Sequence, residues 1–285
     1  MLKQLINLFK LRIGIIMSFT AVVAMAVTPG PPLSGGQIMV LALTVLMAAA
    51  SAGAFNQYYE WDIDRRMRRT CDRPFVTGRL RHSPFWLMVI SGLLVTGVTW
   101  AGWVLGGMAA LYIFLGAFFY AIVYTVWLKR RTWLNIVIGG ASGSFAVLAG
   151  AAAVDPNLTP IPALFALVLF FWTPSHFWSL AIAQRDDYVA AGIPMLPVVM
   201  GDERAARIIL FNTLALVTAS ILPFFFGLGW VYLTGAVAGG GYFLHRNLQL
   251  VKDPTPGSAM RCFFASLIQL STLLTAAMVD VLLIG

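Results

Sequence analysis

The feature that most constrains this chain is a series of long apolar segments, each long enough to cross a lipid bilayer. A helix that spans the hydrocarbon core needs about 20 predominantly apolar residues. These apolar runs are continuous, whereas the strands of a membrane β-barrel alternate between apolar and polar residues. We therefore predict an all-α membrane protein with nine transmembrane helices, at residues 12–29, 37–60, 84–105, 108–127, 133–153, 162–183, 205–226, 228–245 and 261–283.

The overall composition agrees with this class. Hydrophobic residues make up 60% of the 285 residues and charged residues only 11%, and the mean hydropathy is +0.84. Such a chain has more apolar surface than a water-soluble core of this length can bury. No linker divides it, so we predict a single bundle that forms one polytopic domain, residues 1–285. Four helices separate its two long charged loops, near 61–83 and 184–207, which suggests two four-helix halves plus a ninth helix.

The charges predict how the chain is oriented in the membrane. With nine spans, all nineteen Lys and Arg residues fall on one side, together with nine of the eleven acidic residues. Cytoplasmic loops carry such an excess of basic residues. We therefore expect a cytoplasmic N-terminus, a periplasmic C-terminus and a location in the bacterial inner membrane. The net charge of +8 follows from this topology and from anionic lipid headgroups, and it does not indicate nucleic-acid binding.

The first cluster of ionisable residues lies at the cytoplasmic end of the second predicted helix, in the stretch NQYYEWDIDRRMRRTCDRP. Asn56, Glu60 and Asp64 are spaced four residues apart and share one face of a helix, whereas Asp62 lies on the opposite side. An amide oxygen and two carboxylates suit Mg²⁺, which completes its shell with water and substrate phosphate. The alternative is a charged helix end with ion pairs to Arg68. The depth of Asn56 in the membrane and the recurrence of acidic residues later in the chain favour the metal site.

A second acidic cluster follows the sixth predicted helix. Asp186 and Asp187 are adjacent, and neighbouring carboxylates repel each other unless a cation lies between them. We expect them to supply the other half of the same metal site. His176, ten residues earlier, falls within the bilayer, where an ionisable residue is a candidate for function. The alternative is a buried histidine bonded to a backbone carbonyl that Pro174 leaves free.

Basic and aromatic side chains near these clusters are candidates for substrate binding. A diphosphate carries about three negative charges and needs arginines or lysines nearby. The ring faces of tyrosines can stabilise a cation in a dry pocket. The alternatives are topology and lipid contact for the basic residues and ordinary aromatic packing for the tyrosines. The predicted set comprises Arg68, Arg73, Lys129, Arg130, Tyr120, Tyr124 and His176.

The first cluster resembles a motif of the UbiA superfamily of intramembrane prenyltransferases, whose members share a nine-helix fold. That family carries an Asn-x-x-x-Asp-x-x-x-Asp motif after its second helix. Asn56, Glu60 and Asp64 match it, with Glu in place of the middle Asp. The resemblance implies that these side chains hold Mg²⁺ on a prenyl diphosphate.

The second cluster departs from the family's pattern in a way that points to one branch. Many members carry Asp-x-x-Asp-Asp after the sixth helix. Asp186 and Asp187 match its end, but Ala183 stands in place of the leading carboxylate. The stretches TPSHFWSLAIAQRDDYVAAGIPMLPVV, DIDRRMRRTCDRP and YTVWLKRRTWLNIVIGGASG are similar to the branch that farnesylates protohaem IX. This resemblance covers nearly the whole chain.

The resemblance implies an activity and its partners. The substrates would be farnesyl diphosphate and haem b, and the product would be haem O for terminal oxidases, with a haem A synthase or an oxidase assembly factor as a further partner. We hypothesise that His176 contacts the haem or orders the water that reacts. The metal ion implied is Mg²⁺, held by Asn56, Glu60, Asp64, Asp186 and Asp187.

Two other functions fit parts of the pattern. A sister prenyltransferase would act on a quinone precursor or on chlorophyllide, but Ala183 argues against it. A membrane transporter would place polar residues at the midplane of the bilayer, between two repeated halves. Both acidic clusters are instead predicted at the same cytoplasmic level, which favours an enzyme that opens to one side.

Overall fold

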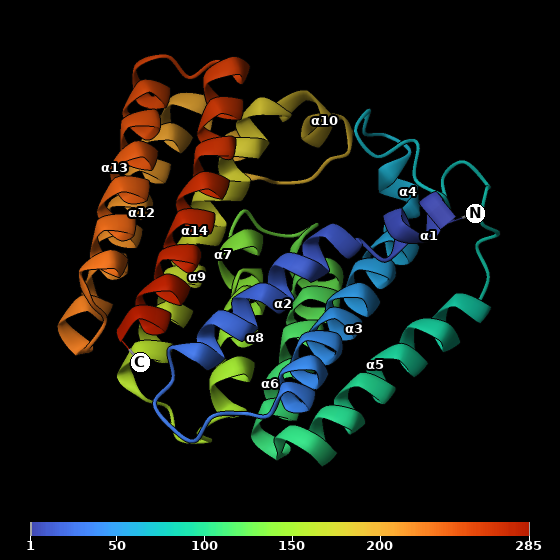
Figure 1. The fold of residues 1–285 in the computed structure, drawn as a ribbon. Coiled ribbons are helices and arrows are strands. Elements are labelled where there is room, and N and C mark those ends of the chain that lie inside the picture. Colours follow the sequence, from blue (N-terminus) through green and yellow to red (C-terminus); the bar gives the residue numbers. More distant parts are fainter. Residues whose placement is uncertain (1, 285) are drawn as a thin grey trace.

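The computed structural model describes residues 2–284, and every regular element in that range is a helix (Figure 1). The first half of the chain forms α1 (Leu2–Leu8), α2 (Leu11–Ala26), α3 (Gly35–Tyr59), α4 (Trp61–Asp64), α5 (Phe85–Leu105), α6 (Gly107–Phe118) and the π-helix η1 (Phe119–Leu128). The second half forms α7 (Asn135–Gly139), α8 (Ala141–Ala152), α9 (Pro160–Ala183), α10 (Arg185–Ala190), α11 (Leu196–Met200), α12 (Asp202–Ile221), the 3₁₀-helix η2 (Leu222–Phe226), α13 (Trp230–Lys252) and α14 (Pro256–Ile284).

Each predicted apolar segment coincides with a helix, and the all-helical membrane class is confirmed. Within residues 2–284, seven helical stretches have the length and hydropathy of a membrane span. The apolar helix α2 is shorter, at 16 residues, and α13 is not among the seven. The number of nine membrane crossings therefore stays a prediction.

Two of the predicted helices change their winding or are divided in the structure. The segment predicted at 108–127 begins as α6 and continues as η1, where the Lys129 N–H bonds to the Tyr124 carbonyl five residues back. The segment predicted at 133–153 is divided at Gly140 into α7 and α8. A Cβ atom on Gly140 would lie 2.9 Å from the Thr173 side chain, so the lack of a side chain at Gly140 allows a close approach to α9.

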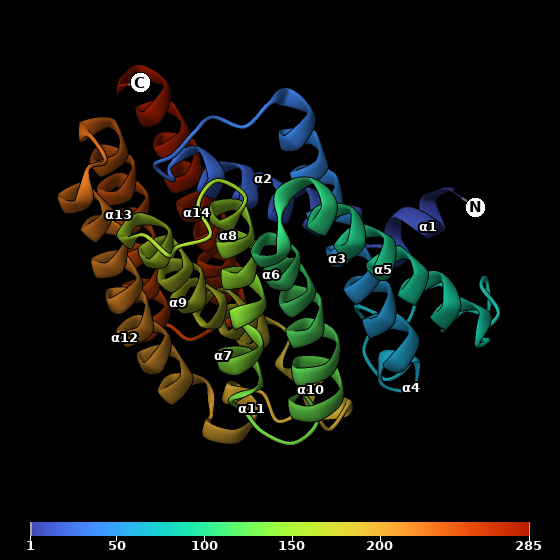
Figure 2. The same cartoon turned by 90° about the horizontal axis from the view of Figure 1, so that it is seen from below.

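The long helices pack in two groups, which Figure 2 shows side by side. The helices α9, α12, α13 and α14 form one group, α2, α3, α5 and α6 form the other, and α8 contacts both. Phe165, Tyr232 and Phe243 are fully buried in the core of the first group. Small residues allow helices to approach closely in a membrane. A Cβ atom on Gly150 would lie 2.0 Å from the Ala21 carbonyl oxygen, so only glycine fits where α2 crosses α8.

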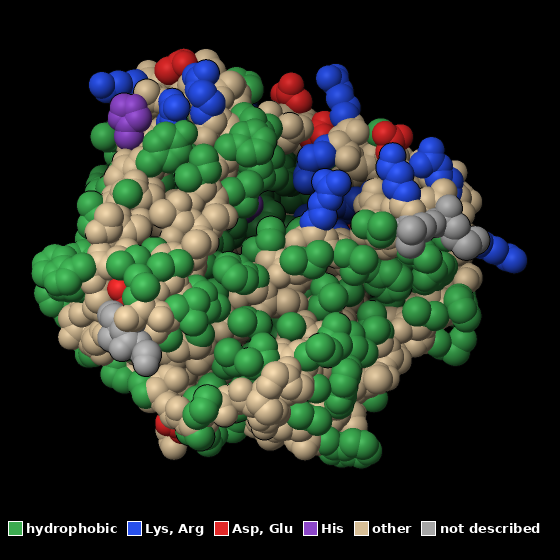
Figure 3. Space-filling view, viewed as in Figure 1, with side chains coloured by type: hydrophobic (Ala, Val, Ile, Leu, Met, Phe, Trp, Pro, Cys, Tyr) green, Lys and Arg blue, Asp and Glu red, His purple; other side chains and the backbone are tan. Residues whose placement is uncertain are grey.

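The two charged loops lie at the same end of the bundle. Figure 1 shows α4, α10 and the N-terminus at this end and the C-terminus at the opposite end. In Figure 3, Lys and Arg side chains gather mainly at this end, whereas hydrophobic side chains cover much of the sides. Large apolar side chains are exposed on the helices, such as Trp103 at 86% and Phe211 at 70%. Lipid is the solvent that such a surface requires, so the chain is a multi-pass membrane protein.

A buried carboxylate near the C-terminus has a structural role. Asp280 is 1% exposed, and its two oxygens accept hydrogen bonds from the backbone N–H groups of Gly229 and Tyr232. These donors lie at the start of α13, where a helix has no internal partners for its N–H groups. Asp280 of α14 therefore caps α13.

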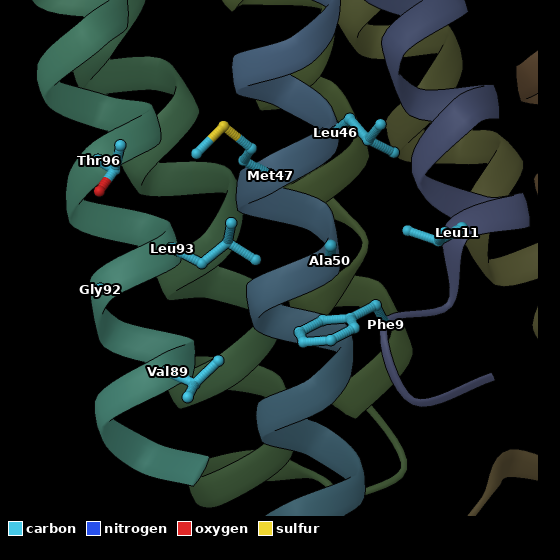
Figure 4. A pocket seen from close by; sticks show the side chains of 9 residues that line it. All are labelled: Phe9, Leu11, Leu46, Met47, Ala50, Val89, Gly92, Leu93 and Thr96. Carbon is cyan, nitrogen blue, oxygen red and sulfur yellow. The ribbon is translucent and has the colours of Figure 1, made fainter. Parts of the chain in front are cut away.

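An open groove of about 470 Å³ lies on the outside of the bundle, between the start of α2, α3 and α5 (Figure 4). Its lining is almost wholly apolar and contains no ionisable side chain, so it fits lipid acyl chains and offers no group for catalysis. The groove is lined by Phe9, Leu11, Leu46, Met47, Ala50, Val89, Gly92, Leu93 and Thr96.

Candidate active site

The end of α3 and the short helix α4 hold the first acidic motif in a buried position. Asn56, Glu60 and Asp64 are 2%, 0% and 2% exposed. Helix α3 ends at Tyr59 and α4 begins at Trp61, so the helical path is largely kept across Glu60. The Asn56 side-chain amide donates to Glu60 Oε2 over 2.8 Å. The structure thus brings the first two members of the motif into contact, with the third one turn further on.

Basic side chains from separate parts of the chain contact this motif. Lys129, just after η1, lies 2.5 Å from Glu60 Oε2, and Arg73 lies 2.6 Å from Asp64 Oδ2. Lys10, between α1 and α2, donates over 2.8 Å to the amide oxygen of the motif's asparagine. Burial raises the pKa of the Asp64 carboxyl, although the Arg73 guanidinium acts in the opposite direction. Carboxylates taken out of water need such partners, so the motif and its cations form one buried charge cluster.

The π-helix η1 supplies further groups to this cluster. The Tyr120 hydroxyl accepts from Lys10 Nζ over 2.9 Å, and Thr125 Oγ1 accepts from Asn56 Nδ2 over 3.1 Å. The rings of Tyr120 and Tyr124 stack with their centroids 5.6 Å apart. π-helical turns are frequent at functional sites, and this one directs several of its side chains toward the acidic motif.

The second acidic motif meets the first loop through one of its two aspartates. Asp187 is 6% exposed and accepts from the backbone N–H of Arg69 over 3.1 Å. The hydroxyl of Tyr188 lies 3.4 Å from the Arg69 guanidinium. Asp186 is exposed, and its side chain has no hydrogen-bond partner in the described range. The loop after α4 and the helix α10 are therefore in contact through Asp187 and Tyr188.

Other predicted site residues lie apart from the buried carboxylates. Arg130 pairs with Asp62 over 2.9 Å in an exposed ion pair, which agrees with the expected position of Asp62 on the opposite side of the helix. Arg68 is exposed, and its side chain makes no hydrogen bond to any residue between 2 and 284. His176 lies on α9, in the wall of a cavity.

A cavity of about 550 Å³ leads from this charge cluster into the apolar interior. Lys10 and Tyr120 line the cavity beside the motif, and Trp172 and His176 line it on α9. Apolar side chains of α2 and α14 supply much of the remaining wall. Figure 3 shows a hollow on this face below the basic side chains. The volume is typical of sites for small molecules, roughly 300–1,000 Å³.

Glu60 has an oxygen that is available to a metal ion. Its Oε1 atom is buried and has no hydrogen-bond partner in the described part of the chain, and such an atom is costly unless a ligand satisfies it. No group of three or more His, Cys, Asp and Glu side chains within residues 2–284 is arranged as a metal site. Mg²⁺ commonly binds one or two carboxylates together with substrate phosphates. The residues therefore fit a metal ion that is shared with a phosphorylated substrate.

Sequence reasoning missed three residues of this cluster, namely Lys10, Arg69 and Thr125. Lys10 resembles the other basic residues that precede the first span, and 46 positions separate it from its partner Asn56. Arg69 bonds to the second motif through its backbone N–H, which no side-chain pattern reveals. Thr125 is uncharged and lies within an apolar run. The one available signal was a lysine directly before an apolar segment, since a cation buried there needs a partner.

Comparison with known proteins places the chain in a family. Residues 17–268 match the UbiA prenyltransferase family. The chain is 56% identical, over 100% of its own length and 99% of the relative's, to Protoheme IX farnesyltransferase 2 of Paramagnetospirillum magneticum. It is 46% identical, over 98% of both chains, to Protoheme IX farnesyltransferase 1 of the same organism. The chain therefore belongs to the UbiA prenyltransferase family, in the branch that contains these relatives.

Solved structures share the fold of this chain. A structure reported for digeranylgeranylglyceryl phosphate synthase in membranes has a TM-score of 0.81 at 17% identity, and 98% of both chains is covered. A UbiA homolog from Archaeoglobus fulgidus, bound to DMAPP and Mg²⁺, has a TM-score of 0.70 at 16% identity. In that comparison 97% of this chain and 99% of the homolog are covered. At these identities the likeness confirms the fold.

Proposed function

We propose that this chain transfers a farnesyl group from farnesyl diphosphate to a vinyl group of protohaem IX (haem b), with addition of water, to give haem O and diphosphate. The observation that carries the proposal is the 56% identity, over the full length, to a relative named as a protoheme IX farnesyltransferase. Prenyl transfer follows from the family, whereas farnesyl diphosphate and haem as substrates rest on the names of the relatives.

The buried cations beside the acidic motif would bind the diphosphate. Lys10, Arg73 and Lys129 come from three separate segments, and each contacts a residue of the motif. Charge-assisted bonds to phosphate oxygens are strong, so a bound diphosphate would take over part of these contacts. Arg68, Arg130 and Asp186 are exposed and would contribute only from the rim of the site.

The two acidic motifs would hold Mg²⁺ together with the diphosphate. Asn56, Glu60, Asp64 and Asp187 would hold it, and the support from the structure is that Glu60 Oε1 lacks a partner among residues 2–284. A family member bound to DMAPP and Mg²⁺ supports the same combination of ligands. Bound Mg²⁺ would neutralise charge on the diphosphate and make it a better leaving group.

The proposed reaction breaks the bond between farnesyl C1 and the diphosphate oxygen and forms a carbon–carbon bond to the haem. The electron pair of the broken bond leaves with the diphosphate, and the π electrons of the vinyl group attack the allylic carbon. Water adds to the resulting cation and loses a proton, which gives the hydroxyl group. The apolar cavity would take the farnesyl chain and keep bulk water from the allylic carbon as its bond to the diphosphate breaks. Lys10 Nζ lies 5.4 Å from the ring centroid of Tyr120, and Lys129 Nζ lies 5.6 Å from that of Tyr124, which supports a role for these rings in stabilising positive charge.

We also propose how the chain lies in the membrane. It crosses the bacterial inner membrane nine times as a single domain, with a cytoplasmic N-terminus and a periplasmic C-terminus. The support is the one-sided distribution of all nineteen basic residues and the gathering of Lys and Arg at the end that carries α4 and α10 (Figures 1 and 3). The active site then opens to the cytoplasm.

Incubating membranes that contain the protein with haem b, farnesyl diphosphate and Mg²⁺ tests the proposed activity. We expect mass spectrometry of the extracted pigments to show haem that has gained a farnesyl group and a hydroxyl group. The new mass should be absent when a chelator removes Mg²⁺ and in membranes that lack the protein. Farnesylation of a quinone precursor or of chlorophyllide, without any haem O, would overturn the assignment of haem as the substrate.

A further inference from the structure

A buried threonine of the π-helix η1 lies between the backbone of its own helix and the first acidic motif. Thr125 is 0% exposed. Its Oγ1 donates to the Tyr120 carbonyl oxygen, five residues back, over 2.8 Å, and it accepts from Asn56 Nδ2 over 3.1 Å. Threonine hydroxyls within α-helices bond to the carbonyl four residues back, as Thr44 of α3 does to Val40. The bond across five residues matches the π-winding of η1, which directs Thr125 toward α3.

The hydrogen bonds of Thr125 fix the orientation of the Asn56 amide. A threonine hydroxyl has one proton, and this one is donated to the Tyr120 carbonyl oxygen. The hydroxyl oxygen therefore accepts from Asn56, which requires the NH₂ group of the amide on this side. Glu60 Oε2 accepts from the same NH₂ group over 2.8 Å, and Lys10 Nζ donates to the amide oxygen over 2.8 Å. The amide oxygen thus faces Lys10, which lines the cavity.

The three partners of the Asn56 amide differ in what else they can bind. Lys10 and Glu60 carry charges, and in the proposed function they bind the diphosphate and Mg²⁺. Thr125 is uncharged and its proton is held by the backbone of η1, so a bound diphosphate does not compete for it. Mg²⁺ binds the oxygen of an amide side chain, whereas an amide turned by half a rotation would present its NH₂ group to the metal. Thr125 is therefore the partner that can keep the oxygen on the metal side while the charged groups rearrange.

We propose that Thr125 is a positioning residue that holds the Asn56 amide with its oxygen toward the metal ion. This inference rests on the proposed function, in which Asn56 is one of the ligands of Mg²⁺. Thr125 acts through Asn56, and no covalent bond changes. Groups that orient a metal ligand by a hydrogen bond typically account for about 10–100-fold in metal affinity or activity. The proposal also gives the π-winding of η1 a role in function.

Metal binding to the purified full-length protein tests this role without turnover. The probe is Mn²⁺, which takes the same oxygen ligands as Mg²⁺, in the presence of inorganic diphosphate, and equilibrium dialysis measures the bound fraction. Thr125→Val keeps the shape of the side chain but removes the hydroxyl, so Mn²⁺ should bind about tenfold or more weakly. Thr125→Ala should show the same loss, which keeps the test valid if the valine variant does not fold. Thr125→Ser keeps the hydroxyl and should retain the wild-type affinity.

Thr44→Val is the matched control for these variants. Thr44 is also 0% exposed, and within residues 2–284 its hydroxyl bonds only to the backbone of α3. The control should bind Mn²⁺ as the wild type does. Unchanged Mn²⁺ affinity in Thr125→Val, or an equal loss in Thr125→Ser or in Thr44→Val, would overturn the proposal.

The Mg²⁺ dependence of haem O formation separates positioning from a purely structural role. In Thr125→Val, the Mg²⁺ concentration for half-maximal activity should rise about tenfold or more, while the rate at saturating Mg²⁺ should fall much less. A structural role would lower the amount of folded protein and leave this concentration unchanged, which would contradict the proposal.

The Mn²⁺ measurement contains neither haem nor farnesyl diphosphate, so it distinguishes this inference from the proposed function. If the wild type makes no haem O, the proposed function fails, whatever the metal affinities show. If the wild type makes haem O but Thr125→Val binds Mn²⁺ as the wild type does, only the role of Thr125 fails.

Discussion

Two buried carboxylates near opposite ends of the bundle are satisfied in different ways. Glu60 is 0% exposed and Asp280 is 1% exposed. Both oxygens of Asp280 accept backbone N–H groups at the start of α13. Glu60 uses one oxygen for the side chains of Asn56 and Lys129, and its Oε1 has no partner within residues 2–284.

The difference separates a structural acid from one that can bind a ligand. Backbone donors at the start of α13 cannot leave Asp280 without unravelling that turn. Side-chain donors such as those around Glu60 can rotate away, and its unpartnered oxygen offers a position for a cation. Burial does not distinguish the two residues, whereas the identity of the donors does. Replacing Glu60 should therefore change activity, and replacing Asp280 should change stability.

The largest effect is expected for Glu60→Gln. Glutamine keeps an oxygen that accepts hydrogen bonds but removes the charge that faces Lys129 and would face Mg²⁺. We expect haem O formation per folded molecule to fall on the order of 10²-fold, as measured by mass spectrometry of pigments. Glu203→Gln is the control, since the chain's other glutamate is exposed at the start of α12. Equal activity of the two variants would remove Glu60 from the site.

Asp280→Ala should act on stability instead. The substitution leaves the N–H groups of Gly229 and Tyr232 without their acceptor, at a cost of about 1–3 kcal/mol. We expect a lower midpoint of thermal unfolding in detergent and unchanged activity per folded molecule. Asp280→Asn keeps one acceptor oxygen and should lose less. A variant that unfolds like the wild type but has lost activity would break the comparison, because Asp280 would then have a role in function.

The two aspartates of the second motif offer a second comparison, in which the burial of the carboxylates differs. Asp187 is buried against the Arg69 backbone, whereas Asp186 is exposed. We expect Asp187→Asn to lower kcat/KM for farnesyl diphosphate about tenfold, as the loss of a metal ligand or of its support does. Asp186→Asn should lower it less. Equal losses of kcat/KM in the two variants would contradict the view that the buried aspartate contributes more to activity than the exposed one.

Much of the fold could be predicted because the thickness of the bilayer sets the length of each apolar segment. Helices α3, α5 and α9 begin and end within two residues of their predicted bounds. The π-winding of η1 and the division at Gly140 could not be predicted, since they depend on neighbours from other helices. A Cβ atom on Gly140, for example, would meet Thr173 of α9.

The acidic motif of the site could be predicted because its spacing is local. Charge and a separation of four residues suffice to place Asn56 beside Glu60. The residues that contact the two acidic motifs could not be predicted in this way. Lys10 contacts Asn56 across 46 positions, and Asp187 meets a backbone N–H group across 118 positions. Only tertiary packing brings such groups together, and no periodicity in the sequence indicates these contacts.

The smallest effect is expected for Asp62, two positions before Asp64. Asp62 lies in an ion pair with Arg130, in which the side chains are 47% and 38% exposed. Burial tends to raise the pKa of Asp62, but the hydrogen bond and the charge of Arg130 outweigh it, so that the pKa is lowered. A carboxyl with a lowered pKa adds stability at neutral pH, which is lost as the pH falls through that pKa.

Asp62→Asn should therefore cost at most about 0.5 kcal/mol at neutral pH, because exposed ion pairs contribute little. The difference in unfolding midpoint from the wild type should vanish in acid, once the carboxyl of the wild type is protonated. Haem O formation should stay at the wild-type level, while Asp64→Asn, made in parallel, should lower it strongly. If the two variants lost activity equally, the helix face on which a carboxylate lies would not determine whether it reaches the substrate. The contrast between Glu60 and Asp280 would then need another explanation.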